Sequence, residues 1–289
     1  AYTLSRDGEQ GVWKAPVAGG DTVELYDSGF PEKGDAWLAG WSHDGRFVFF
    51  WQGDINSASM LADGVPLYAL PSTGGEPAQL AFAMEDANVL VYPQSVAPAP
   101  VDSSDPTRIA LSLGGGRDTL LNKQVGVASI ADGSFTSLSP RGQSAIALSW
   151  SPDGKRLAYT AVDSEAIANA DSPHKRLMQR RIYTVDMGGD VRPLTGDPTY
   201  RDEYPLWSAD SAYILFPRLN DQNEASLWLV PASGGETVLV VDALSPLAEE
   251  FWSGYYGYVE WGHLLDWWQP APGTASPTPA GLTLSLIHI

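Results

Sequence analysis

A short phrase that begins with Trp-Ser recurs along the chain and constrains its fold more than any other feature. Its copies are residues 41–46, 150–155 and 207–212, and an apolar run follows each of them. Seven residues after the phrase Trp stand Val48, Leu157 and Ile214, and nine after it stand Phe50, Tyr159 and Phe216. Apolar side chains at a period of two and a constant offset indicate strands that present one packed face to a neighbouring sheet.

Glycine-rich turns alternate with this phrase. They are Gly19-Gly20, Gly74-Gly75, Asp132-Gly133, Gly188-Gly189 and Gly234-Gly235. Their spacing of about 46 to 58 residues is the period of a four-stranded propeller blade. The sequence therefore predicts an all-β chain, a β-propeller of four-stranded antiparallel blades.

The repeat divides the chain into five clear blades. The first is partial, with strands expected over 1–5, 11–17 and 22–26 and without its innermost strand. The others are expected over 36–83, 88–139, 145–195 and 204–241. The third of the five lacks the Trp phrase and keeps only strand-like runs at 89–92, 109–111, 125–127 and 135–138. The aromatic segment 251–261 is expected to help close a ring of six blades.

The geometry of a tight turn explains why Asp and Gly recur in the phrase. Asp hydrogen-bonds a turn backbone and Gly accepts a positive φ, so the two residues close a tight loop between strands. We expect the bulky Trp to pack between adjacent blades. Folding thus accounts for the phrase without any chemical function.

The propeller is expected to span residues 1–268. Residues 269–283 include a Pro-rich stretch that cannot form a core and is typical of an extended linker or stalk. The last six residues, 284–289, back-translate to a transposon end used in preparing sequencing libraries, and we hypothesise that they are a sequencing scar outside the fold. The alternative is a natural apolar strand.

Charge and composition exclude several classes of partner. The net charge of −18 leaves no basic stripe to neutralise phosphates, which argues against nucleic acid and against an anionic membrane surface. The chain has no Cys, hence no disulfide and no thiolate metal site. No stretch of 18 or more apolar residues is present, so we expect no membrane span. Taken with the many turns, these properties suit a secreted or cell-surface β-protein.

The phrase resembles the TolB-like β-propeller repeat, Trp-Ser-Pro-Asp-Gly-Lys followed by an apolar strand. Residues 150–155 match it in full; residues 41–46 depart at His43, and residues 207–212 depart at Ala209, Ser211 and Ala212. The resemblance covers residues 1–268 and implies a propeller of about six to eight blades. Such repeats occur in periplasmic or secreted binding proteins and in the gating domain of prolyl-oligopeptidase-type serine peptidases. The resemblance specifies a fold and not a reaction.

Long loops between the second and third strands of the blades mark one face as the binding face. They are expected over 53–66, 161–179 and 217–226, whereas the turns on the opposite face are tight. Binding residues tend to lie on long loops of a rigid scaffold. On this face a basic loop offers Arg176, Arg180 and Arg181 to a carboxylate, a phosphate or an acidic partner. The alternative is a solvated turn that offsets local acidity.

A second candidate site is the funnel of the propeller. The residues just before each phrase Trp lie on the link into the innermost strand: Asp35, Trp37, Ser144, Asp202, Glu203, Glu249 and Glu250. An acidic, aromatic funnel suits a cation, an amine terminus or a sugar. The alternative is ordinary polar lining of a wet channel.

No catalytic or metal motif is found. Ser42, His43 and Asp44 are adjacent on one turn, whereas a triad needs these groups brought together in space with separate roles. The Gly-x-Ser-x-Gly elbow is absent, and no His pair has metal-ligand spacing. We expect no cofactor and no metal.

Three functions follow from this reading. The first is a non-enzymatic, monomeric, extracytoplasmic propeller (periplasmic, secreted or at the cell surface) that binds a protein, peptide or glycan on its long-loop face. The second is the substrate-gating propeller of a truncated prolyl-oligopeptidase-type peptidase. The third is a polysaccharide-active propeller enzyme, which would need a carboxylate or His cluster in the funnel.

Overall fold

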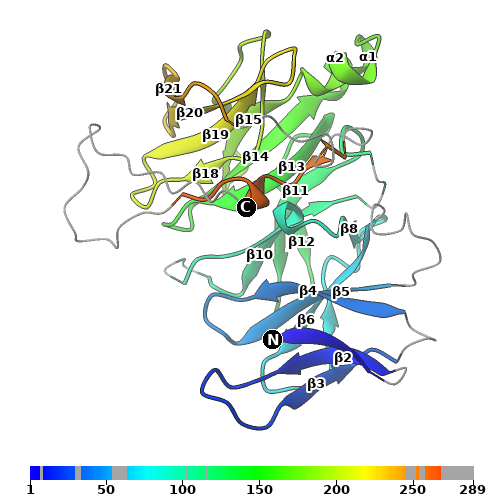
Figure 1. Cartoon of the computed structure of the whole chain (residues 1–289). Coiled ribbons are helices and arrows are strands. Elements are labelled where there is room, and N and C mark those ends of the chain that lie inside the picture. The colour runs from blue at the N-terminus through cyan, green and yellow to red at the C-terminus, as the bar shows by residue number, and fades with distance from the viewer. Residues whose placement is uncertain are drawn as a thin grey trace. The chain divides into compact units, whose positions relative to one another are not determined.

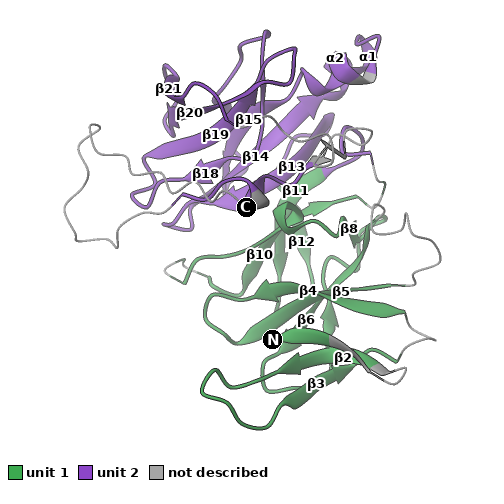
Figure 2. Ribbon diagram, viewed as in Figure 1, with its two compact units in different colours: residues 1–117, 124–137 green, residues 118–123, 138–289 purple. Residues whose placement is uncertain are grey.

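Antiparallel sheets follow one another along the chain in the computed structural model (Figure 1). The structure describes residues 1–6, 9–29, 34–53, 64–101, 103, 105–114, 116, 118–244, 252–253 and 258–267. The chain divides into two compact units, the first made of residues 1–117 and 124–137 and the second of residues 118–123 and 138–289 (Figure 2).

The first unit begins with the first two blades expected from the repeat. The first blade has three strands: β1 (Tyr2–Arg6), β2 (Glu9–Lys14) and β3 (Val23–Asp27). The second blade has four: β4 (Asp35–Trp41), β5 (Phe47–Gly53), β6 (Val65–Pro71) and β7 (Ala78–Gln79). Each strand pairs antiparallel with the next one along the chain.

The third blade is irregular. Its strands are β8 (Asn88–Val89), β9 (Val96–Pro98), β10 (Arg108–Leu113), β11 (Gln124–Ser129) and β12 (Phe135–Ser137). The strand expected over 89–92 is wrong in its extent: it ends at Val89, because the chain turns there, with the Tyr92 N–H donating to the carbonyl oxygen of Leu90 at 2.7 Å. A 3₁₀ turn, Pro93–Ser95, follows. β8 pairs with both β6 and β10, so the second and third blades share one hydrogen-bonded sheet.

The second unit holds the fourth and fifth blades. The fourth is β13 (Gln143–Trp150), β14 (Arg156–Asp163), β15 (Arg181–Asp186) and β16 (Val191–Pro193). In the fifth, the first strand is split into β17 (Arg201–Asp202) and β18 (Leu206–Trp207), followed by β19 (Tyr213–Leu219), β20 (Ala225–Pro231) and β21 (Val238–Val241). A short pair, β22 (Trp252–Ser253) with β23 (Tyr258–Val259), precedes the 3₁₀ turn Trp261–His263.

The phrase Trp of the fifth blade packs between blades, as predicted. Trp207 is 6% exposed and shares a cluster with Ala158 and Ile182 of the fourth blade and Ile214 of its own. Its Nε1 donates to the carbonyl oxygen of Ser149 at 3.2 Å. The buried indole therefore packs its apolar ring against both blades and has a hydrogen-bond acceptor for its N–H.

The phrase Ser has a role that the sequence argument missed. In each copy its hydroxyl donates to the phrase Asp (2.6–2.7 Å) and accepts the backbone N–H of the residue five positions on (2.8–2.9 Å). The Asp in turn accepts a backbone N–H two residues on, at 3.0–3.1 Å. The predicted Asp and Gly turn is confirmed, with φ values of +70° at Gly45 and +67° at Gly154.

Several predicted features lie outside the described residues. They are loop residues 54–63, Glu249, Glu250, the Pro-rich linker 269–283 and the hexapeptide 284–289. The domain boundaries and the number of blades stay predictions.

Candidate binding site

The connection between β14 and β15 folds into two short helices, α1 (Ser164–Ala168) and α2 (Pro173–Leu177). The second begins where the sequence supplies helix-start signals: Ser172 caps it by accepting the Lys175 N–H at 3.2 Å, and Pro173 occupies its first turn. Ile167 and Leu177 bury against Leu120 and Val162. These apolar contacts hold the loop to the blade.

A hydrogen-bond contact joins this loop to the next long one. His174 of α2 lies 2.9 Å from Asp221, from Nε2 to Oδ1, and Asp221 belongs to the turn between β19 and β20. That turn is closed by Asn220, whose side-chain oxygen accepts two backbone N–H groups. The second-to-third loops of the fourth and fifth blades therefore meet.

A pocket of about 530 Å³ lies among these loops. Its walls come from α1 and α2 and the residues just after each, from the connection after β16, and from the turn after β19. The lining residues are Ala166, Asn169, Ala170, Lys175, Met178, Gln179, Pro198, Thr199 and Asp221. The pocket therefore lies on the face that carries the predicted long loops.

The lining combines an apolar part with polar groups. Ala166, Ala170, Met178 and Pro198 supply apolar surface, and the amides of Asn169 and Gln179 supply donors and acceptors. Lys175 bonds Asp171 at 2.9 Å, from Nζ to Oδ2. No aromatic ring is among the lining residues.

The wall after β16 is shaped by one carboxylate. Asp197 accepts the hydroxyl of Thr199 at 2.7 Å and its backbone N–H at 2.9 Å. These two hydrogen bonds lower the pKa of Asp197 against a smaller effect of burial. Asp197 stays ionised and fixes the position of Thr199 in the wall.

The three arginines of the predicted basic loop do not share a surface. Arg180, expected on an exposed loop, is 2% exposed: its Nη1 donates to Glu203 at 2.7 Å and its Nη2 to Thr119 at 2.7 Å. Arg181 is half-buried and donates from Nη1 to the carbonyl oxygens of Met178, Arg180 and Tyr200. Arg176 lies on α2. Arg180 and Arg181 are engaged with the protein itself.

Four of the predicted funnel residues lie in first strands and not on the links before them, and Glu203 lies between β17 and β18, the two halves of one first strand. Asp35 and Trp37 belong to β4, Ser144 to β13 and Asp202 to β17. Pairing with the second strand already begins at Asp35, Gln143 and Arg201, so these positions are part of the sheets.

These funnel residues are engaged within the protein. Ser144, Asp202 and Glu203 are at most 3% exposed, and Ser144 donates to the carbonyl oxygen of Thr119 at 3.3 Å. Trp37 packs against the cluster around Phe49. Burial raises the pKa of Asp35, against a hydrogen bond from Gln10.

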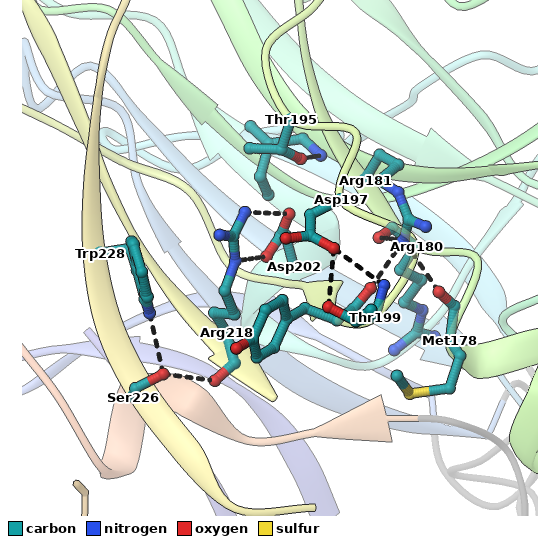
Figure 3. Close-up of polar contacts among 12 residues, drawn as sticks. Met178, Arg180, Arg181, Thr195, Asp197, Thr199, Asp202, Arg218, Ser226 and Trp228 are labelled. Atoms are coloured by element: carbon teal, nitrogen blue, oxygen red, sulfur yellow. Dashed lines mark hydrogen bonds and ion pairs between the residues drawn. The ribbon is translucent and has the colours of Figure 1, made fainter. Parts of the chain in front are cut away.

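Asp202 belongs to a network around Arg218, shown in Figure 3. Arg218 binds Asp202 through two contacts, from Nε to Oδ1 at 2.6 Å and from Nη2 to Oδ2 at 3.0 Å. The guanidinium also lies 4.8 Å from the ring centre of Trp228 and 5.1 Å from that of Tyr200. Arg218 was not a predicted site residue, and a single Arg in an apolar strand gives no signal of these contacts.

The adjacent Ser42, His43 and Asp44 do not form a relay. Ser42 donates to Asp44 at 2.7 Å, while His43 Nδ1 lies 2.9 Å from the carbonyl oxygen of Ala99. Within the described ranges no three His, Cys, Asp or Glu side chains gather as a metal site would require. Nor does any helix in that part of the chain have the length and apolarity to cross a bilayer.

No family model and no curated protein matches this sequence. Solved structures do match. A prolyl endopeptidase structure is 12% identical with a TM-score of 0.54, over 82% of this chain and 31% of that one. Oligogalacturonate lyase from Vibrio parahaemolyticus is 11% identical with a TM-score of 0.53, over 84% and 62%. TolB from Acinetobacter baumannii is 14% identical with a TM-score of 0.46, over 83% and 52%.

These similarities concern the fold. The chain spans less than two thirds of the length of each of the three proteins. Identities this low carry no activity from one protein to another, because one scaffold hosts many functions. Together with the antiparallel blades, the similarities to the prolyl endopeptidase and to the lyase, both with a TM-score above 0.5, establish that this chain folds as a β-propeller.

Proposed function

We propose that this chain is a non-enzymatic, extracytoplasmic propeller that binds an extended peptide segment of a protein partner on its long-loop face. The observation that carries the proposal is the pocket formed where the loops of the fourth and fifth blades meet. Its volume of about 530 Å³ falls within the range typical of ligand sites.

The lining favours a peptide over a glycan. The amides of Asn169 and Gln179 match the donors and acceptors of a peptide backbone, and the apolar surface of Met178 and Pro198 suits a side chain. A large flat ring on which a sugar could stack is missing from the lining. Lys175 and Asp221 place one charge of each sign at the pocket, which suits a polar segment with both.

Peptide selection tests the proposal. Peptides are selected on the wild type from a random display library, and their affinities are measured by fluorescence anisotropy. Ala170→Trp fills the pocket and is expected to weaken binding at least tenfold, since a steric block removes the contacts of the peptide. Ala131→Trp is the matched control, because Ala131 is exposed on the turn after β11, and it is expected to bind like the wild type.

Two further variants address the amides. Asn169→Ala and Gln179→Ala are each expected to weaken binding about three- to tenfold, because each removes about one hydrogen bond to the peptide. If the selected peptides bind Ala170→Trp as tightly as the wild type, the pocket is not the site and the proposal fails.

A prolyl endopeptidase is among the similar structures, which keeps the gating function as the alternative. Recovering the gene around this segment separates the two functions. A following domain with a Gly-x-Ser-x-Gly elbow and later Asp and His would make the propeller a peptidase gate, whereas another binding module or an anchor would agree with the proposal.

A further inference from the structure

A buried cluster of charges in the second unit carries more positive than negative charge. It consists of Arg180, Arg201, Glu203 and the indole of Trp261, all at most 3% exposed. Arg180 donates to Glu203 Oε1 and Trp261 donates to Glu203 Oε2, both at 2.7 Å. Arg201 also lies beside Glu203, so the guanidinium groups of Arg180 and Arg201 share one carboxylate.

Arg201 is the poorly compensated member. It is 1% exposed, and its Nε lies 3.4 Å from Glu203 Oε1 without a hydrogen bond. This buried N–H has no acceptor in the described part of the chain. By contrast, Arg180 has Glu203 and Thr119 as close partners.

The neighbouring Asp202 does not supply the missing negative charge. Successive side chains of a strand point to opposite faces, so Arg201 and Glu203 share one face and Asp202 lies on the other. There Asp202 is bound through both oxygens by Arg218. The charged groups that act on Arg201 are Glu203, which favours its cation, and Arg180, which opposes it; burial has the largest effect and lowers its pKa.

A buried cation without a full partner is costly. Removing one charge from water costs several kcal/mol unless an opposite charge and hydrogen bonds repay it. A buried water molecule satisfies donors but neutralises nothing. A buried guanidinium Nε–H without an acceptor is a donor suited to a carboxylate oxygen or a halide.

We propose that Arg201 binds a small monovalent anion, a formate-sized carboxylate group or a halide, which neutralises the cluster of Arg180, Arg201 and Glu203 in the second unit. The anion completes the hydrogen bonding of Arg201 and stabilises the contact between β17 and the turn at Trp261. This site is separate from the loop pocket and does not depend on the proposed function.

Thermal unfolding with matched sodium salts tests the proposal. Replacing 200 mM gluconate, which is too bulky for a buried site, by 200 mM formate or chloride is expected to raise the Tm of the wild type by about 2–4 °C. A larger response to formate would identify a carboxylate site, and a larger response to chloride a halide site. Arg201→Gln is expected to show neither response.

The matched control is Arg192→Gln, because Arg192 is exposed and is expected to respond like the wild type. An equal response in Arg201→Gln, or no response in the wild type, would overturn the proposal. If Arg201→Gln does not fold, Arg201→Met takes its place. Wild-type crystals grown in sodium bromide test the halide form independently: an anomalous peak within hydrogen-bonding reach of Arg201 supports a halide site. The absence of that peak, together with no Tm response to formate, refutes the proposal.

Discussion

At the scale of single residues, the phrase turn works through side-chain to backbone hydrogen bonds. Ser151 is fully buried, and its hydroxyl joins Asp153 to the N–H of Arg156. The third copy keeps this arrangement although it has lost the glycine: Ser211 takes its place with a φ of +59°. The hydrogen bonds of the phrase therefore hold a non-glycine residue in a left-handed conformation that costs about 1–2 kcal/mol.

We predict that Gly154→Ala lowers the free energy of unfolding by about 1 kcal/mol, because a Cβ at a φ of +67° is strained. Ser211→Gly is expected to raise it by up to about 0.5 kcal/mol, since relief of strain is partly offset by loss of the hydrogen bond from the Asp153 N–H. Urea unfolding measures both. Gly196→Ala is the control, with no atom within 4 Å of its Cβ and no positive φ; a loss there equal to that of Gly154→Ala would contradict the account.

At the scale of elements, the blades and the long loops differ in how far the sequence predicts them. Period-two apolar runs predict β5, β14 and β19 closely, because strand pairing and burial both follow from that pattern. The phrase Trp-Ser predicts the turns and the position of Trp207. The helices α1 and α2 were predicted only as a loop, because five-residue helices are too short for a periodic signal.

The candidate sites were harder to predict than the strands. Arg180 and Glu203 pair over 23 positions in the sequence, and Trp261 reaches Glu203 over 58. Taken alone in the sequence, the basic stretch that holds Arg180 and the acidic pair Asp202-Glu203 are each typical of solvated surface. Only the pairing of blades brings them together, and so the sequence placed Arg180 on an exposed loop.

We predict that Ile167→Ala lowers the free energy of unfolding by about 2–4 kcal/mol, because Ile167 is 5% exposed against Leu120, Val162 and Leu177. Since α1 also carries Ala166 of the pocket, affinity for a selected peptide should fall in the same variant. Leu121→Ala, at a position 42% exposed, should change neither quantity by much. Equal losses of stability in the two variants would show that the α1 segment is not anchored by this cluster.

At the scale of the whole molecule, the acidic chain gains stability from carboxylates that hydrogen-bond the backbone. The hydroxyl of Ser208 is the main cause that lowers the pKa of Asp210, against partial burial. For Asp153, burial alone would raise the pKa, but hydrogen bonds from Ser151 and from the Lys155 N–H outweigh it, and the pKa is lowered. A carboxyl whose pKa is lower when folded stabilises the fold above its unfolded pKa and loses that contribution on acidification.

We therefore predict that this contribution is complete above about pH 5 and is lost as the pH falls below the ordinary Asp pKa of 3.8. Asp210→Asn should be less stable than the wild type at pH 6 and should differ less from it at pH 3. Urea midpoints at both pH values measure this. Asp21→Asn is the control at an exposed position outside the phrase. A difference between Asp210→Asn and the wild type that is the same at pH 6 and pH 3 would contradict the prediction.

The central claim is that the loops of the fourth and fifth blades bind a peptide. Backbone amide NMR of the isotope-labelled chain, titrated with a selected peptide, tests it most directly. The account predicts that the largest shift changes lie in residues 164–179, 197–199 and 220–224, which line or border the pocket. Changes concentrated in the first unit, with these segments unaffected, would contradict it.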